Sequence, residues 1–310
     1  MQYTHNFSLK GLICLFICFI STTVVYSQNN DFQHKKDSLL KVIASTKGEE
    51  KLEAYKALTF PTQYSKEEVD LMLQHINDFI REARKQQNKK YECIAYQYEL
   101  VYLWNNLIHD KFEQKANEYL PFFKKNGFSK YYYNTYLFLL NLSRKNDPKQ
   151  VIEGAKQMYE EAKQENCLFG ITQATCLIAQ TYFDENRYGE AEKYYGETIK
   201  DALKLILKEP DIANYTLVLN GYDGLTHALG MQDKLNEMLS LMPAWKKHAI
   251  DYEKMFGRPD PFLSSYYNLF ATAYIDKDEY DKAELYCDSL EQMNLKPSEL
   301  NSLLYVKAEI

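Results

Sequence analysis

Residues that form turns are scarce in this sequence. It contains 11 Gly and 8 Pro in 310 residues. An all-β sandwich or barrel joins many short strands through turns that use these two residues, so the composition disfavours both classes. Hydrophobic residues make up 45% and charged residues 26% of the chain, which is typical of a folded protein rather than a disordered one.

The motifs that mark common enzyme and cofactor sites are also missing. The sequence has no HExxH, GxSxG, Walker A, GxGxxG or Cys-x-x-Cys motif. None of the six His residues is three or four positions from another, the spacing by which a helix presents two His side chains to one metal. The sequence therefore predicts no catalytic residue, no bound metal and no cofactor.

The first 27 residues have the layout of an export signal. An apolar run from Gly11 to Val25 follows a single positive charge, Lys10, and Val25-Tyr26-Ser27 suits cleavage after Ser27. The run is shorter than the ~20 residues that span a bilayer, which favours a cleaved signal over an anchor helix. Cys14 and Cys18 lack the preceding small residue of a lipoprotein signal. We therefore expect the mature chain in the periplasm.

The mature chain is acidic. After removal of residues 1–27, 36 Lys and Arg stand against 43 Asp and Glu, a net charge of −7. A negative charge of this size opposes nonspecific binding to phosphate backbones and anionic lipid. A nucleic-acid partner is accordingly not expected.

Apolar residues recur at helical spacing throughout the mature chain. Ser65 and Glu68 have the spacing of a capping box, which predicts a helix with Met72, Ile76 and Phe79 on its apolar face. We predict that Pro243 kinks or breaks one helix. The further predicted helices are 91–108, 111–124, 129–145, 148–165, 168–185, 188–207, 212–229, 232–255, 262–276, 279–293 and 298 onward.

Two helix pairs share an internal spacing. In each pair a small residue and a large aromatic precede a second Ala, which lies nine positions after the Tyr. The first match is Thr175, Ile178, Ala179, Tyr182, Ala191 and Tyr195. The second match is Tyr267, Phe270, Ala271, Tyr274, Ala283 and Cys287. Both are similar to the tetratricopeptide repeat, in which such small residues let two helices approach closely and the Tyr fills the space beside them.

The resemblance implies an all-α fold, an α-solenoid of antiparallel helix pairs that form a right-handed superhelix. Residues 28–88 match the pattern poorly and are interpreted as an N-terminal helical capping region, followed by a repeat array over 89–310. The last segment, from Pro297, reads as the first helix of a pair. We expect the array to continue beyond Ile310 and to be followed by a membrane span and a cytoplasmic signalling output domain.

First helices of such repeats line the concave face, where aromatic side chains can hold a peptide or stack on a sugar. The alternative for each of these residues is packing between helices. The candidate ligand contacts are Tyr98, Tyr102, Tyr132, Tyr136 and Tyr266.

Four cysteines follow the signal segment: Cys93, Cys167, Cys176 and Cys287. Cys167 and Cys176 are nine positions apart on one predicted helix, beyond disulfide reach. We expect four buried free thiols.

The chain most resembles the periplasmic repeat region of bacterial membrane-anchored regulators, whose output is a histidine kinase or a DNA-binding domain. The resemblance implies a non-catalytic sensory region that binds a protein or peptide, for example a periplasmic ligand-binding component. As an alternative to an array that continues, the last helix could end the array by forming a homodimer. Three other functions stay open: a free-standing periplasmic scaffold, a glycan-binding lipoprotein and an α-helical glycosidase with paired carboxylates.

Overall fold

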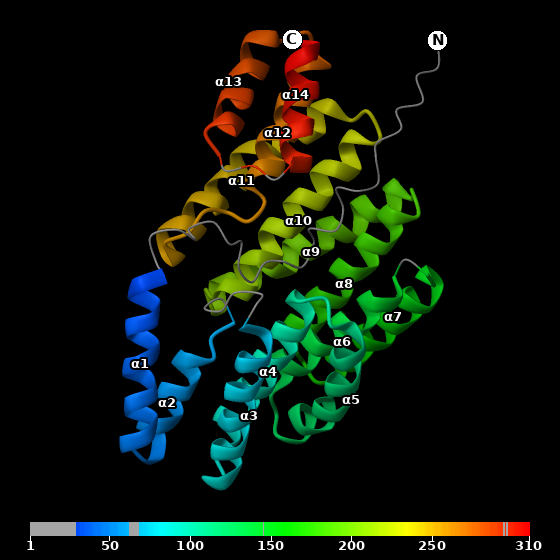
Figure 1. The fold of residues 1–310 in the computed structure, drawn as a ribbon. Coiled ribbons are helices and arrows are strands. Elements are labelled where there is room, and N and C mark those ends of the chain that lie inside the picture. Colours follow the sequence, from blue (N-terminus) through cyan, green and yellow to red (C-terminus); the bar gives the residue numbers. More distant parts are fainter. Residues whose placement is uncertain (1–28, 62–67, 145, 294, 296) are drawn as a thin grey trace. The chain divides into compact units, whose positions relative to one another are not determined.

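The chain is all-α over the residues that the structure, a computed structural model, describes: 29–61, 68–144, 146–293, 295 and 297–310. The predicted export signal and Ser65 of the predicted capping box lie outside these ranges. The helices, shown in Figure 1, are α1 (Asn29–Ser45), α2 (Gly48–Leu58), α3 (Val69–Lys85), α4 (Lys89–Asn105), α5 (His109–Lys125), α6 (Ser129–Ser143), α7 (Pro148–Gln164), α8 (Leu168–Asp184), α9 (Tyr188–Lys208), α10 (Ile212–Gly230), α11 (Leu235–Phe256), α12 (Leu263–Ile275), α13 (Tyr280–Glu291) and α14 (Pro297–Glu309).

These helices divide into two compact units. The N-terminal unit ends at Leu142 and the C-terminal unit begins at Ser143. Within each unit consecutive helices pack on one another through short connections, so neighbours are antiparallel and form solenoid-like layers. The boundary predicted at residue 88 falls between α3 and α4, which pack together inside the N-terminal unit.

Seven connections share one turn. In each, the middle residue of three has a positive φ, and the third residue donates its N–H to a carbonyl five positions earlier, as in Arg187 to Tyr182 at 2.9 Å. This is the Schellman closure of a helix, which satisfies terminal carbonyls and reverses the chain. The positive-φ residues are Gln87, Leu107, Gly127, Asn166, Asn186, Asp233 and Asp278.

The predicted packing residues lie where helices meet. Ala179, Ala191, Ala271 and Ala283 have no exposed surface, and Tyr195 is 2% exposed. Tyr182 is also buried, whereas Tyr274 is half-buried.

Two details differ from expectation. Of the two predicted effects of Pro243, a kink or a break, the break is wrong, because α11 runs without interruption from Leu235 to Phe256 with Pro243 inside it. Cys93, Cys176 and Cys287 are buried free thiols, whereas Cys167 is only half-buried because it lies in the turn before α8.

Candidate functional site

Three helices of the C-terminal unit carry polar stripes. The spacing of three and four positions places the members of each stripe on one face of its helix. The stripes are Gln173, Cys176, Gln180 and Asp184 on α8; Thr216, Asn220, Asp223 and His227 on α10; and Ser265, Asn268 and Thr272 on α12. We call these eleven residues the polar face.

The stripes lie next to one another because α10 contacts both α8 and α12. The amide Nδ2 of Asn220 lies 3.4 Å from Sγ of Cys176. The hydroxyl of Ser265 donates a hydrogen bond to Asp223. The polar face is thus continuous across three successive first helices of the pairs.

Arg144 fixes the α8 end of the polar face. Its Nε lies 2.9 Å from Oδ2 of Asp184, and its Nη1 donates to Oε1 of Gln180 at 2.9 Å. The side chain of Arg144 is 10% exposed, so this ion pair lies mostly out of water and is stabilised by its additional hydrogen bond. Gln180 in turn places Nε2 3.4 Å from Sγ of Cys176. The network holds the α8 stripe in one arrangement.

Glycines on α10 bring α9 close behind this face. A Cβ on Gly224 would lie 2.2 Å from the ring of Tyr195, and one on Gly221 would lie 2.7 Å from Cγ1 of Ile199. Both contacts are shorter than any side chain tolerates without movement. Because Gly221 and Gly224 have no side chain, α10 can pack closer to α9 than a residue with a Cβ would allow.

Asp223, His227 and Ser265 contain the residue types of a hydrolase triad, but their geometry differs from one. Nε2 of His227 lies 3.2 Å from Oγ of Ser265 and 3.7 Å from Oδ1 of Asp223. Burial raises the pKa of Asp223, against the opposing effects of His227 and the Ser265 hydrogen bond. In a triad the imidazole lies between the acid and the hydroxyl and uses a different nitrogen for each. Here the hydroxyl of Ser265 donates to the acid, and this hydrogen bond joins α10 to α12.

Several acceptors of the polar face are buried without a hydrogen-bond partner. They include Oδ1 of Asn220, Oδ1 of Asn268 and Oγ1 of Thr216. Buried polar atoms are normally paired, and an unpaired one calls for an explanation such as a bound water or ligand. His227, Ser265 and Asn268 are partly exposed, so the α10–α12 part of the polar face reaches solvent.

The tyrosines predicted as ligand contacts are divided between the two units. Tyr98, Tyr132 and Tyr136 are half-buried on helices of the N-terminal unit, and Tyr102 on α4 is 3% exposed. Tyr266 belongs to the C-terminal unit and is also 3% exposed. The ring of Tyr266 packs edge-on against Trp245, with centroids 5.2 Å apart. Tyr102 and Tyr266 therefore take part in helix packing.

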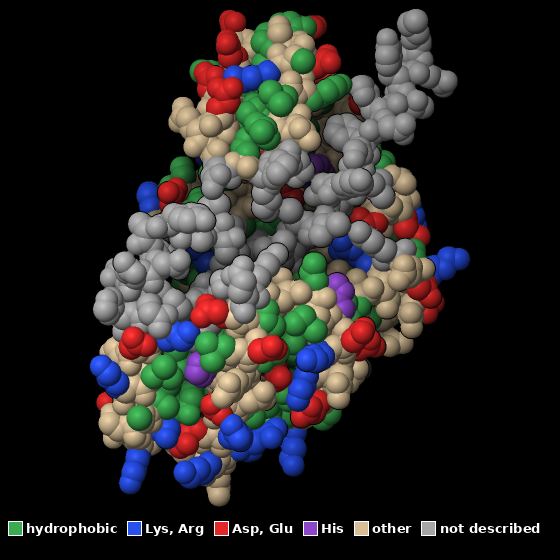
Figure 2. All heavy atoms as spheres, in the orientation of Figure 1, with side chains coloured by type: hydrophobic (Ala, Val, Ile, Leu, Met, Phe, Trp, Pro, Cys, Tyr) green, Lys and Arg blue, Asp and Glu red, His purple; other side chains and the backbone are tan. Residues whose placement is uncertain are grey.

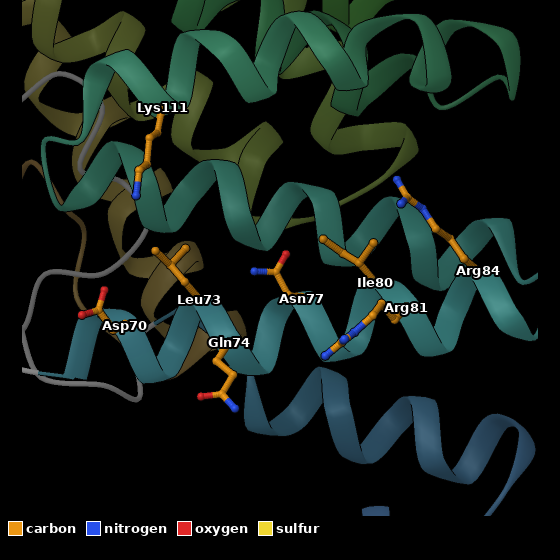
Figure 3. Close-up of a pocket in the computed structure, with 8 residues that line it drawn as sticks. All are labelled: Asp70, Leu73, Gln74, Asn77, Ile80, Arg81, Arg84 and Lys111. Atoms are coloured by element: carbon orange, nitrogen blue, oxygen red, sulfur yellow. The ribbon is translucent and has the colours of Figure 1, made fainter.

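The N-terminal unit has a separate open groove of ≈ 650 Å³. Figure 3 shows Lys111 of α5 pointing toward the start of α3, while Arg81 and Arg84 lie near its end. The lining residues are Asp70, Leu73, Gln74, Asn77, Ile80, Arg81, Arg84 and Lys111.

Two of the three cations in this groove are already paired. Arg81 is bound to Asp78, and Nε of Arg84 lies 3.1 Å from Oε1 of Glu92. Only Lys111 has no ion pair within the described ranges. The groove thus offers a mixed polar surface without a concentrated charge.

Sequence reasoning missed the polar face because it followed apolar periodicity. The signal was nevertheless present: Gln, Asn, Asp and Ser at helical spacing interrupt otherwise apolar first helices, and two glycines accompany them on α10.

No protein-family model matches the chain, and no curated protein is similar to it. Among the residues the structure describes, no group of His, Cys, Asp or Glu could hold a metal ion. No described helix is both long and apolar enough to cross a membrane.

Proposed function

We propose that this chain is a non-catalytic binding protein, and that the polar face of the C-terminal unit holds an extended segment of a protein partner. The observation that carries this proposal is the row of unpaired acceptors on a continuous face of successive helices. Repeat proteins bind partners along such extended surfaces.

The spacing of the polar face suits a peptide backbone. Packed helices lie 8–10 Å apart, and an extended chain rises about 3.3 Å per residue. Amides on adjacent helices, such as Asn220 and Asn268, can therefore meet backbone groups about three residues apart. Their unpaired carbonyl oxygens are buried in this structure, so they would accept from N–H groups of the segment once these side chains turn outward.

Charge favours a basic or neutral segment. Residues 143–310 contain 28 Asp and Glu against 19 Lys and Arg. A net negative unit attracts a positively charged partner and steers its approach.

The biological setting that we propose is the exported side of a bacterial signalling regulator. It is supported by the apolar run from Gly11 to Val25 and by the two repeat-like matches around Ala179 and Ala271. A periplasmic scaffold would bind its partner through the same surface. A structural protein as the partner would favour the scaffold function over the signalling function.

The test begins with peptides selected from a random phage-displayed library on the mature chain. Fluorescence anisotropy then compares Kd for a selected peptide between the mature chain and the double variant Asn220→Ala/Asn268→Ala. Loss of two hydrogen bonds should weaken binding about 10- to 100-fold. The matched control is Asn117→Ala, which removes an exposed amide on α5 and should leave Kd unchanged. Equal affinity of the double variant and the control would refute the proposal.

A further inference from the structure

Two turns at one edge of the N-terminal unit are rich in basic side chains. Residues 81–92, around the α3–α4 turn, and residues 121–131, around the α5–α6 turn, together contain eight Lys and Arg against two Glu. The α4–α5 turn at the opposite edge, residues 105–112, has one Lys and one Asp. Figure 2 shows Lys and Arg side chains along the lower edge of the N-terminal unit. We call the exposed lysines of the two turns the lysine edge: Lys85, Lys89, Lys90, Lys124 and Lys125.

Contacts between helices bring the two turns together. Nζ of Lys89, at the start of α4, lies 5.2 Å from the ring centre of Phe122, near the end of α5. Nζ of Lys124, at the end of α5, lies 5.3 Å from the ring centre of Tyr132 on α6. The lysine edge is thus one continuous surface at the ends of neighbouring antiparallel helices.

The carboxylates within these turns are covered and already paired. The side chain of Glu92 is 5% exposed and pairs with both Lys89 and Arg84. The side chain of Glu82 is 15% exposed, and its Oε2 lies 3.7 Å from Nζ of Lys51. Three members of the lysine edge make no ion pair with any residue that the structure describes: Lys85, Lys90 and Lys125. Their positive charges therefore face solvent without a neighbouring carboxylate.

We propose that the lysine edge binds the surface of an anionic phospholipid membrane. Lysine carries a compact, strongly hydrated charge that suits contact with many head groups, whereas the planar fork of arginine suits bidentate binding to one phosphate. Clusters of about four to eight basic residues attract proteins to anionic lipid in this way. The negative net charge of the whole chain hides this surface, because 28 of the 43 acidic side chains lie in residues 143–310.

The aromatic side chains of these turns favour a membrane over a single-stranded nucleic acid. Proteins that bind single strands offer aromatic rings on which the bases stack. The rings of Phe122 and Phe128 instead stack on each other with centroids 6.0 Å apart, and the ring of Tyr131 lies 6.1 Å from that of Phe123. None of these four rings is exposed, so the contact depends on charge.

Vesicle flotation tests the proposal with the mature chain, residues 28–310. The vesicles contain phosphatidylglycerol and phosphatidylcholine, or phosphatidylcholine alone. The chain should float with the anionic vesicles only, and high salt should release it because salt screens exposed charges. The variant Lys85→Gln/Lys90→Gln/Lys125→Gln should partition at least about tenfold more weakly. Arg at the same three positions keeps the charge and should keep the binding.

The matched control is Lys156→Gln/Lys200→Gln/Lys246→Gln, which removes the same charge from exposed positions on α7, α9 and α11. It should partition like the wild-type chain. Flotation that is absent, that is equal with neutral vesicles, or that falls equally in the two Gln variants would overturn the proposal. Binding of a labelled single-stranded DNA through the same three lysines, without binding to vesicles, would assign the lysine edge to nucleic acid and also overturn it.

Discussion

The two units join their helices by different means. In the N-terminal unit, charged groups link helices: Glu92 of α4 pairs with Arg84 of α3, and it also accepts hydrogen bonds from Tyr96 at 2.7 Å and Lys89 at 2.8 Å within its own helix. Burial acts to raise the pKa of Glu92, but these hydrogen bonds outweigh it and hold the pKa below its ordinary value. In the C-terminal unit, glycines bring the helices close and mostly neutral amides and hydroxyls line one face.

Net charge separates the units as well. Residues 29–142 contain 17 basic and 15 acidic side chains, whereas residues 143–310 contain 19 and 28. Figure 2 shows basic side chains gathered over the N-terminal unit. Buried polar atoms without a hydrogen-bond partner occur in both units, for example Oε1 of Gln97 and Oγ1 of Thr135 in the N-terminal unit. In the C-terminal unit several of them belong to the continuous polar face, and this arrangement is what favours binding there.

The largest expected effect tests the close approach in the C-terminal unit. Gly224→Ala places a Cβ 2.2 Å from the ring of Tyr195, which is 2% exposed. We expect urea denaturation to show a loss of about 3 kcal/mol or more in the free energy of unfolding. Gly196→Ala, in α9 with nothing within 4 Å of the new Cβ, should instead gain about 0.5–1 kcal/mol. Similar losses for both variants would contradict the packing described.

A pH dependence should come from Asp260, which precedes α12. Burial raises its pKa to about 7, although it accepts hydrogen bonds from the backbone of Phe262 at 2.8 Å and from Trp245 at 3.0 Å. A carboxyl whose pKa is raised on folding binds a proton more tightly in the folded state. Asp260 therefore adds to the free energy of unfolding at acidic pH, and this contribution is lost as pH rises from about 4 through about 7.

The measurement compares the wild-type chain with Asp260→Asn, which keeps one acceptor and cannot ionise. Between pH 4 and pH 7.5 the unfolding free energy of the variant should gain about 2–3 kcal/mol relative to wild type. A difference that does not change with pH would show that Asp260 ionises normally.

The charged links of the N-terminal unit predict the next effect. Tyr119 donates a hydrogen bond to Glu99, which is 4% exposed and whose pKa is raised by burial. Tyr119→Phe leaves this carboxyl without its donor and should cost about 2 kcal/mol in chemical denaturation. Adding Glu99→Leu to the same chain should recover part of the loss, because it removes the unsatisfied group. A loss no smaller in the double variant would exclude this hydrogen bond as the cause.

The sequence predicts the ends of some helices well, but it does not predict the geometry of the turns between them. The ends of α7 and α8 agree with prediction within one residue, because Pro148 starts one helix and the apolar period marks the next. The turn geometry was not predicted, since Leu107 has a positive φ that its residue type disfavours.

The candidate site was harder to predict than the helices. Aromatic content pointed to Tyr102 and Tyr266, but both rings are buried in helix packing. The contacts between Asn220 and Cys176, and between Ser265 and Asp223, join residues more than 40 positions apart. Such contacts depend on how neighbouring helices stack, which periodicity within a helix does not specify.

The smallest expected effect concerns the turns of the N-terminal unit. Leu107 has φ +60° and is 74% exposed, while Gly127 occupies the equivalent turn after α5 with φ +73°. Leu107→Gly relieves a left-handed backbone and should raise the unfolding free energy by about 0.5–1 kcal/mol. Gly127→Leu should lower it by about 1 kcal/mol. If both substitutions shift thermal unfolding in the same direction, the shared turn does not have this energetic role.

Photo-cross-linking tests most directly whether binding belongs to the C-terminal unit. A library-selected peptide that carries a benzophenone is irradiated with the mature chain, and the attachment sites are located by mass spectrometry. The account predicts adducts on α8, α10 and α12, within residues 173–272, and their loss in Asn220→Ala/Asn268→Ala. Adducts confined to the groove around α3 in the N-terminal unit, unchanged in the double variant, would contradict it.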